Sequence, residues 1–184
     1  MDVFDEIEKT FKTLYYGWDG VEQFTGSGDR LRRLVAEMCW PMARIDEESN
    51  KCLKAVYPDP YDEMLVTKPI NVWTFCPHHL LPCNFKVHIG YIPSGKVLGL
   101  SKFARVAVIY GKSPIMQEQY NRDLANFFWE NLKPEGLGVF VTGKHGCMGC
   151  RGVSQELEVI TSVLRGSFKT DGIVREEFYH LCRG

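Results

Sequence analysis

The stretch that decides the fold covers residues 63–92 and reads EMLVTKPINVWTFCPHHLLPCNFKVHIGYI. Its first part, residues 63–75, is rich in Val, Ile, Thr and Trp, which favour strands, and Pro69 indicates an edge strand or a bulge. In residues 85–91, apolar side chains alternate with polar or small ones, which is the period of a half-buried strand. The sequence therefore predicts two strands joined by a short segment that carries cysteine and histidine.

The rest of the chain alternates between helices and strands. The spacing of apolar residues predicts helices over residues 3–15, from Asp29 to Pro41, from Ser101 to Tyr110, over 120–132 and over 173–183. Alternation predicts further strands over residues 137–144 and 151–161, whereas residues 44–62 show no clear period and are expected to be irregular. Paired strands and paired helices in this order predict an α+β fold with an antiparallel sheet.

Length, composition and charge exclude several classes of protein. The chain has 184 residues, 45% apolar and 24% charged, which is typical of a globular domain rather than a disordered or fibrous protein. Its 22 basic and 23 acidic residues give a net charge of −1, so we expect neither nucleic acid nor a membrane as a partner. No apolar run approaches the roughly 18 residues of a membrane span, and the acidic start is unlike a signal peptide. We therefore expect a cytoplasmic protein.

Two short segments bring cysteine and histidine together. Cys76-Pro-His-His79 follows one predicted strand, and His145-Gly-Cys147 follows another. Thiolate sulfur and imidazole nitrogen are preferred zinc ligands, and Cys76, His79 and Cys147 would leave a fourth position for water. His78 and His145 stand beside these ligands and carry the side chain that exchanges protons near neutral pH. The seven cysteines, an odd number, argue against a disulfide framework.

The same residues allow a closed structural zinc site. Cys150 follows Cys147 at Cys-x-x-Cys spacing, and this pair with Cys76 and His79 would make a Cys₃His site without an open position. Such a site would favour a non-catalytic zinc module that binds nucleotide or nucleic acid, and the residue types alone do not separate the two alternatives. The remaining residues of these types have structural interpretations: Cys39, Cys52 and Cys182 as packing thiols, Cys83 as a neighbour that stays off the metal, His88 on the polar face of its strand and His180 exposed on its helix.

A second group of residues predicts a site for an anion and a base. Ser101, Lys102 and Arg105 share the first turns of a predicted helix, where free N–H groups, a hydroxyl and two cations suit a phosphate. Glu118 opens the next helix, where it either complements the helix dipole or accepts two hydrogen bonds from a guanine edge. Three further cations are typical either of a solvated face or of an anion site: Arg30, Arg33 and Arg151.

Together these motifs resemble the GTP cyclohydrolase I family. The resemblance covers about residues 60–180 with few gaps, and the Arg-x-x-Arg pair on the second predicted helix fits the family more weakly. The matching segments are Cys76-x-His-His-Leu-x-Pro82, Lys86-Val-His-Ile-Gly-Tyr-Ile-Pro93, Val97-Leu-Gly-Leu-Ser-Lys-x-Ala-Arg105, Gln117-Glu118, His145-x-Cys147-Met, Arg151-Gly-Val, Thr161-Ser162 and Arg175-Glu-Glu-Phe178.

The resemblance implies a fold and an assembly. It implies the tunnelling fold, an antiparallel four-stranded sheet with two helices packed on one side, preceded by N-terminal helices. Subunits of such proteins close into barrels and stack as a homodecamer with active sites at subunit interfaces. We expect one domain over residues 1–184, with an N-terminal helical region over 1–58 and the catalytic core over 59–184.

The resemblance also implies an activity. A member of this family hydrolyses GTP at C8 of guanine, releases formate and rebuilds the ring as 7,8-dihydroneopterin triphosphate. This is the first step toward folate, tetrahydrobiopterin or 7-deazaguanine products, and the sequence does not choose among them. The implied residues are Cys76, His79 and Cys147 for zinc, His78 and His145 for proton transfer, Glu118 for the guanine edge with Gln117 as a further substrate contact, Ser101, Lys102, Arg105 and Arg151 for the triphosphate, and Arg30 and Arg33 from a neighbouring subunit.

The chain departs from the family pattern at three places. Pro77 stands where the family usually has Glu, Cys83 lies in a stretch that is more usually Pro-Phe, and Cys150 adds a thiol. None of these positions is an implied ligand, proton-transfer histidine or phosphate contact, so we expect activity to be retained.

Overall fold

The computed structural model describes residues 2–183, and the chain divides into two compact units at the junction of Trp40 and Pro41. The first unit contains the helices α1 (Val3–Leu14) and α2 (Ser27–Met38) and a short 3₁₀ turn, η1 (Val21–Phe24). Both predicted helices are confirmed, although α2 begins two residues before the predicted Asp29.

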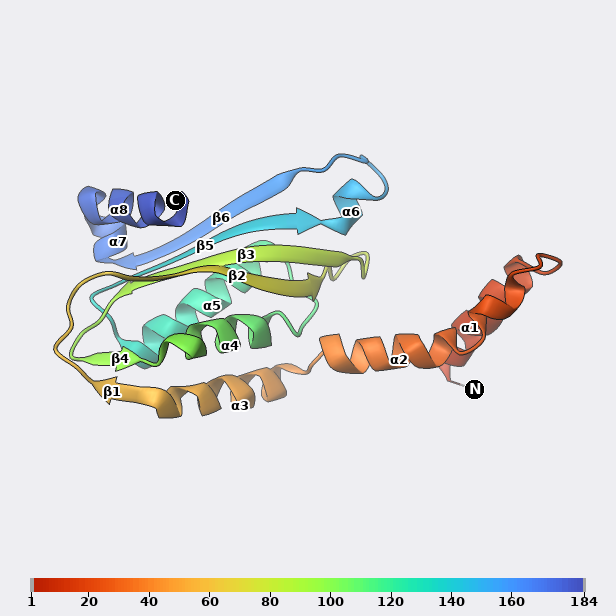
Figure 1. The fold of residues 1–184 in the computed structure, drawn as a ribbon, viewed down its shortest axis with the longest axis horizontal. Coiled ribbons are helices and arrows are strands. Elements are labelled where there is room, and N and C mark those ends of the chain that lie inside the picture. Colours follow the sequence, from red (N-terminus) through yellow and green to blue (C-terminus); the bar gives the residue numbers. More distant parts are fainter. Residues whose placement is uncertain (1, 184) are drawn as a thin grey trace. The chain divides into compact units, whose positions relative to one another are not determined.

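The second unit carries a four-stranded sheet and its covering helices (Figure 1). Its elements are α3 (Met42–Cys52), η2 (Leu53–Ala55), β1 (Val56–Pro58), β2 (Leu65–Phe75), β3 (Pro82–Ile92), β4 (Lys96–Leu98), α4 (Leu100–Tyr110), α5 (Gln117–Leu132), β5 (Gly136–His145), α6 (Gly146–Gly149), β6 (Glu158–Gly166), α7 (Ser167–Thr170) and α8 (Gly172–Arg183).

The sheet has the order β2-β3-β5-β6, with every neighbouring pair antiparallel. Helices α4 and α5 cover one face, and α7 and α8 cover one end of the other (Figure 1). This confirms the predicted subunit fold of four antiparallel strands with two helices on one side. The sheet register breaks between Thr67 and Ile70, so the prediction of an edge strand or bulge at Pro69 is also confirmed.

The core lies between the sheet and helices α4 and α5. The alternating apolar residues of β3 are all buried on this face, from Phe85 at 0% exposed to Tyr91 at 1%. They pack against aromatic side chains of the helices, including Phe103 and Tyr120, with ring centroids about 5 Å apart. This packing fixes the ends of β2 and β5, where the cysteine and histidine segments begin.

Three predictions for the second unit are wrong. Residues 44–62 are not irregular, because α3 and β1 lie there; the apolar stripe of α3 is thin, and its buried face includes Ser49. The last strand runs over β6 rather than 151–161, since the residues after α6 form a loop with two positive-φ positions, Gly152 and Ser154. His88 is only 8% exposed, because its face of the sheet packs on Phe140 near α8.

Two observations bear on the wider predictions. None of the helices in the described chain has the length and apolar character required to cross a bilayer. The division into an N-terminal region over 1–58 and a catalytic core over 59–184 stays a prediction. The two compact units are a separate observation and meet between residues 40 and 41.

Candidate active site

The first functional segment is the tight loop between β2 and β3. The Cys76 N–H donates to the Leu81 carbonyl at 2.9 Å, and the Leu80 N–H donates to the Cys76 carbonyl at 2.8 Å. Leu80 closes the loop with φ +52°, a left-handed conformation that costs a non-glycine residue roughly 1–2 kcal/mol. This closed loop directs the side chains of Cys76 and His79 toward the end of β5.

The second functional segment is the start of α6, directly after β5. A Cβ on Gly146 would lie 2.7 Å from the Pro82 carbonyl oxygen, so only glycine allows α6 to approach the start of β3 this closely. The close approach brings Cys147 opposite the β2–β3 loop. Two segments distant in the sequence thus meet because β3 and β5 are paired neighbours.

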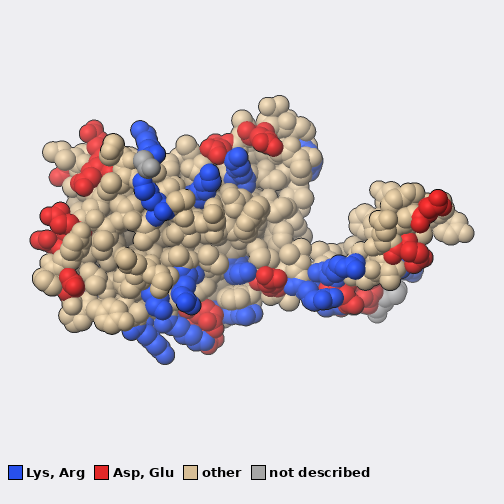
Figure 2. All heavy atoms as spheres, viewed as in Figure 1, with Lys and Arg blue, Asp and Glu red and all other residues tan. Residues whose placement is uncertain are grey.

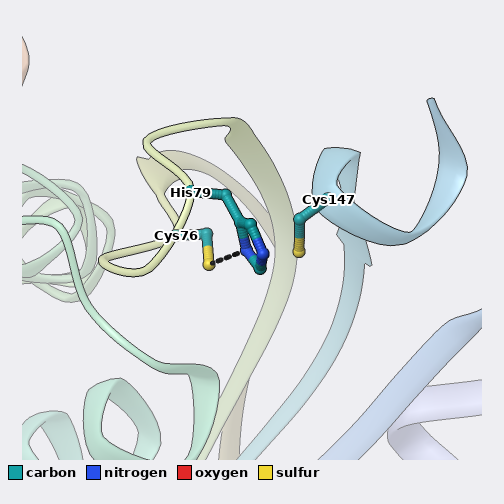
Figure 3. A group of neighbouring side chains, drawn as sticks. All are labelled: Cys76, His79 and Cys147. Carbon is teal, nitrogen blue, oxygen red and sulfur yellow. Dashed lines mark hydrogen bonds between the residues drawn. The ribbon is translucent and has the colours of Figure 1, made fainter. Parts of the chain in front are cut away.

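Cys76, His79 and Cys147 form the metal-binding group of the site. Their ligand atoms all lie within 4.8 Å of one another, and the Cys76 Sγ lies 3.5 Å from the His79 Nδ1 (Figure 3). Cys76 is buried, Cys147 is partly buried and His79 is exposed, so the group opens to solvent on one side. Two sulfurs and one imidazole nitrogen make a donor set for a metal ion that accepts sulfur and nitrogen.

Without a cation, the thiolate form of Cys147 is disfavoured by burial and by the nearby Cys76. Burial raises the pKa of Cys147, and the neighbouring Cys76 raises it further. A bound cation would remove this penalty, since it favours the thiolate form of both ligands. The surroundings of the two sulfurs therefore fit a metal better than they fit two free thiolates.

Cys150 does not join the metal-binding group within the described residues. Its side chain is exposed, and its Sγ donates to the Gly146 carbonyl at 2.9 Å. The closed Cys₃His set that the sequence allowed is therefore not formed. A metal ion held by these three residues alone would keep a position for a further ligand, as catalytic zinc sites do.

His145 is the last residue of β5, two residues before Cys147, and each of its ring nitrogens lies near a different side chain. Its Nε2 lies 2.8 Å from the Gln117 Oε1, and its Nδ1 lies 3.3 Å from the Cys83 Sγ. Burial lowers the pKa of His145, although the carboxylate of Glu118 acts in the opposite direction. His78 has a different setting, because it is exposed and its Nδ1 lies 3.8 Å from the Cys76 Sγ.

The structure gives Gln117 a buried setting beside His145 that the sequence did not reveal. Only 1% of it is exposed, and its amide Nε2 donates to the Val141 carbonyl, the Val159 carbonyl and the Thr161 hydroxyl at 2.9–3.2 Å. In the sequence it reads as a polar residue at a helix start, next to Glu118. In this structure its amide is used entirely within the protein, while Glu118 is exposed in the same turn.

Two of the predicted phosphate residues, Lys102 and Arg105, line a separate groove between α3 and α4. Lys102 and Arg105 border this cavity of about 510 Å³ together with Lys51, and none of its lining residues belongs to the metal-binding group. Lys and Arg side chains gather along this side of the second unit (Figure 2). Ser101 lies in the first turn of α4 but makes no capping hydrogen bond, because Gly99 is the N-cap. The remaining predicted cations are exposed: Arg151 after α6, and Arg30 and Arg33 on α2 of the first unit.

Comparison with known proteins decides the family. A family model described as GTP cyclohydrolase I matches residues 19–183. The chain belongs to the GTP cyclohydrolase I family. The match includes every residue that the sequence motifs singled out, from Arg30 to Arg151.

Named relatives agree with this family. The chain is 39% identical over 150 residues to GTP cyclohydrolase 1 of Rhodopirellula baltica, covering 81% of this chain and 64% of that protein. It is 42% identical over 130 residues to GTP cyclohydrolase 1 of Homo sapiens, covering 70% of this chain and 52% of that protein. A protein of Nostoc named GTP cyclohydrolase 1 2 is 34% identical over 180 residues, covering 97% and 83%. The chain thus spans between half and two thirds of the length of the first two relatives.

Solved structures resemble the chain less closely. An archaeosine synthase QueF-like protein in the apo form superposes with a TM-score of 0.42 at 24% identity, covering 56% of this chain and 94% of that one. A putative dihydroneopterin aldolase (FolB) from Vibrio cholerae superposes with the same TM-score of 0.42 at 9% identity, covering 56% and 98%.

Proposed function

We propose that the protein is a zinc-dependent GTP cyclohydrolase I. In this proposal it hydrolyses GTP at C8 of guanine, releases formate and forms 7,8-dihydroneopterin triphosphate. The observation that carries the proposal is the three-residue metal-binding group of Cys76, His79 and Cys147 with Cys150 outside it. Membership of the GTP cyclohydrolase I family supports the substrate and the product.

The metal-binding group would hold zinc through two thiolates and one imidazole. When bound there, zinc supplies a water molecule that ionises near neutral pH and can attack an electron-poor carbon. The chain's own contribution is to keep the fourth position open and to exclude a third thiol from it. Cys76 and Cys147 also place negative charge beside the ion, which binds the ion and moderates its acidity.

Two histidines are proposed to move protons beside this metal. His78 is exposed in the same loop as Cys76 and is free to donate to a departing nitrogen of the substrate. His145 is fixed by Gln117 and Cys83, so its ring keeps one orientation while bonds change. An exposed imidazole and a fixed one suit two successive proton transfers, first at the purine ring and then at the ribose.

The binding residues are proposed to act far from the reacting carbon. Glu118, exposed in the first turn of α5, would accept hydrogen bonds from N1–H and the exocyclic amine of guanine. Ser101, Lys102, Arg105 and Arg151 would bind the triphosphate. Binding energy from these contacts would hold C8 of guanine beside the metal-binding group.

We also propose that the protein acts as a homodecamer with active sites between subunits. The outer edges of β2 and β6 are unpaired in the described sheet, which supports closure of several subunits into a barrel. Arg30 and Arg33 would then contact the triphosphate of a neighbouring subunit. The seven free cysteines support a reducing compartment, as in the cytoplasm.

The experiment that tests the proposed function measures the products directly. Zinc-loaded protein is incubated with GTP, and formate and dihydroneopterin triphosphate are measured by mass spectrometry with and without a chelator. The proposal predicts equal amounts of both products, abolished by the chelator and restored by zinc. Binding of GTP without formate would contradict the proposed chemistry, and we would then test Pro77→Glu, which restores the residue usual in the family.

A further inference from the structure

The side chain of Cys83 contacts His145, and the sequence motifs did not predict this contact. The two residues are paired across β3 and β5, and both side chains lie on the helix-covered face of the sheet. The Cys83 Sγ lies 3.3 Å from the His145 Nδ1, within hydrogen-bonding distance for sulfur, whereas a second acceptor, the Leu81 carbonyl oxygen, is farther away at 3.9 Å. Only 1% of Cys83 is exposed, and its Sγ has no place in the metal-binding group.

Gln117, the partner of the His145 Nε2, determines which ring nitrogen carries the proton. Gln117 donates through Nε2 to Val141, Val159 and Thr161, which fixes the orientation of its amide. Its Oε1 therefore faces the ring and can only accept, at 2.8 Å from the His145 Nε2. The proton of the neutral ring must then lie on Nε2, and Nδ1 is left with a lone pair.

We propose that Cys83 is a positioning residue that donates its S–H to Nδ1 and so holds the His145 imidazole in one orientation. This inference rests on the proposed function, in which His145 moves a proton. Since Nε2 is committed to Gln117, Nδ1 is the nitrogen that remains for this transfer. A buried cysteine is a thiol, and a thiol is a weak donor, so it holds Nδ1 in place and releases it when a stronger partner arrives.

Two features of the chain favour this role over simple packing. The contact joins the polar end of Cys83 to a ring nitrogen, whereas a packing thiol would contact carbon atoms. The hydrogen bonds continue in one line from Cys83 through His145 and Gln117 to Thr161, which also accepts from the Asn121 amide at 3.0 Å. Each member of this line is oriented by the next, so removal of the terminal donor frees one nitrogen of one ring.

The test measures the His145 ring directly and does not depend on activity. Zinc-loaded full-length protein labelled with ¹⁵N-histidine is examined by solid-state NMR, with His145→Asn used to assign the signals. Cys83→Val removes the S–H donor at similar side-chain volume, whereas Cys83→Ser retains a donor. Cys182→Val is the matched control, because Cys182 is a buried thiol that belongs to a different cluster, with Phe168 and Phe178. In the parent, we expect the ¹⁵N signal of the unprotonated His145 Nδ1 to be that of a nitrogen that accepts a hydrogen bond. Among these three Cys variants, only Cys83→Val should shift this signal to the position of a nitrogen without a hydrogen-bond donor.

Kinetics provide the second readout. We expect Cys83→Val to lower kcat about tenfold with little change in the KM for GTP, and Cys83→Ser to recover part of the loss. The proposal is overturned if the Nδ1 signal of Cys83→Val equals that of the parent, if the parent ring carries its proton on Nδ1, or if kcat is unchanged. Absence of formate from the parent protein would instead contradict the proposed function, and the NMR signals would still decide the role of Cys83.

Discussion

Replacement of Gly143 by alanine should disrupt the support of His145 without touching a proposed ligand. The new Cβ would lie 2.1 Å from the Gln117 Oε1, 2.9 Å from its Cδ and 3.0 Å from the Phe85 ring. Phe85 is 0% exposed and cannot retreat, so the Gln117 amide must move. When it moves, it cannot keep both its bond to His145 and its three bonds through Nε2.

The structure sets the size of this effect. Forcing one extra carbon into a filled core costs about 1–3 kcal/mol. Leaving a buried hydrogen-bonding group without a partner costs about 1–3 kcal/mol more. Because part of the clash is relieved by the movement that breaks the bonds, the two costs overlap. We therefore expect Gly143→Ala to lower the free energy of unfolding by about 2–4 kcal/mol.

Urea denaturation of the variant and parent measures this difference. Gly149→Ala is the matched control, because its Cβ would meet only the Glu156 Cγ at an ordinary 3.8 Å. The control should unfold within about 0.5 kcal/mol of the parent. The reasoning is refuted if Gly143→Ala is as stable as Gly149→Ala, since Gln117 would then have room that the structure does not provide.

The remaining predictions concern metal, substrate and pH. Cys147→Ala should lose bound zinc and Cys150→Ala should retain it, measured by elemental analysis after dialysis; equal loss from both would favour the closed site. The double variant Lys102→Ala, Arg105→Ala should raise the KM for GTP roughly tenfold. It should change the free energy of unfolding by less than about 0.5 kcal/mol, since both side chains border an open groove. An unchanged KM would mean that these two residues do not bind the triphosphate. Burial lowers the pKa of His88 below its ordinary 6.5, so the unfolded chain binds more protons, and stability should fall as the pH drops through 6.5. Urea midpoints should depend less on pH in His88→Leu than in the parent, and equal dependence would contradict this assignment.

The sequence was most informative where spacing and residue type act together. The alternation in β3 predicted its buried face correctly, because period-2 apolar patterns have a single interpretation on a half-covered sheet. Cys76, His79 and Cys147 were expected to converge, and the antiparallel pairing of β3 and β5 brings them within 4.8 Å.

Some features depend on tertiary contacts, and the sequence alone did not predict them. His88 lies on the predicted face of β3, opposite the apolar residues of that strand. This face is nevertheless covered, because it packs near helices at the C-terminal end of the chain that contain residues such as Phe178. Helix α3 was missed because its apolar stripe is too thin to distinguish it from a loop, and a buried serine, Ser49, completes it. Gln117 and Cys83 were not recognised as supports of His145, since their partnership exists only after three elements have packed together.

The measurement that tests the central claim most directly is zinc X-ray absorption spectroscopy of the purified protein. We expect two sulfur neighbours at about 2.3 Å and two nitrogen or oxygen neighbours at about 2.0–2.1 Å, one of them a solvent ligand. The same spectrum should result from Cys150→Ala, because Cys150 lies outside the metal-binding group. Three sulfur neighbours in the parent, falling to two in Cys150→Ala, would mean that the site is closed and would contradict the proposed catalytic centre.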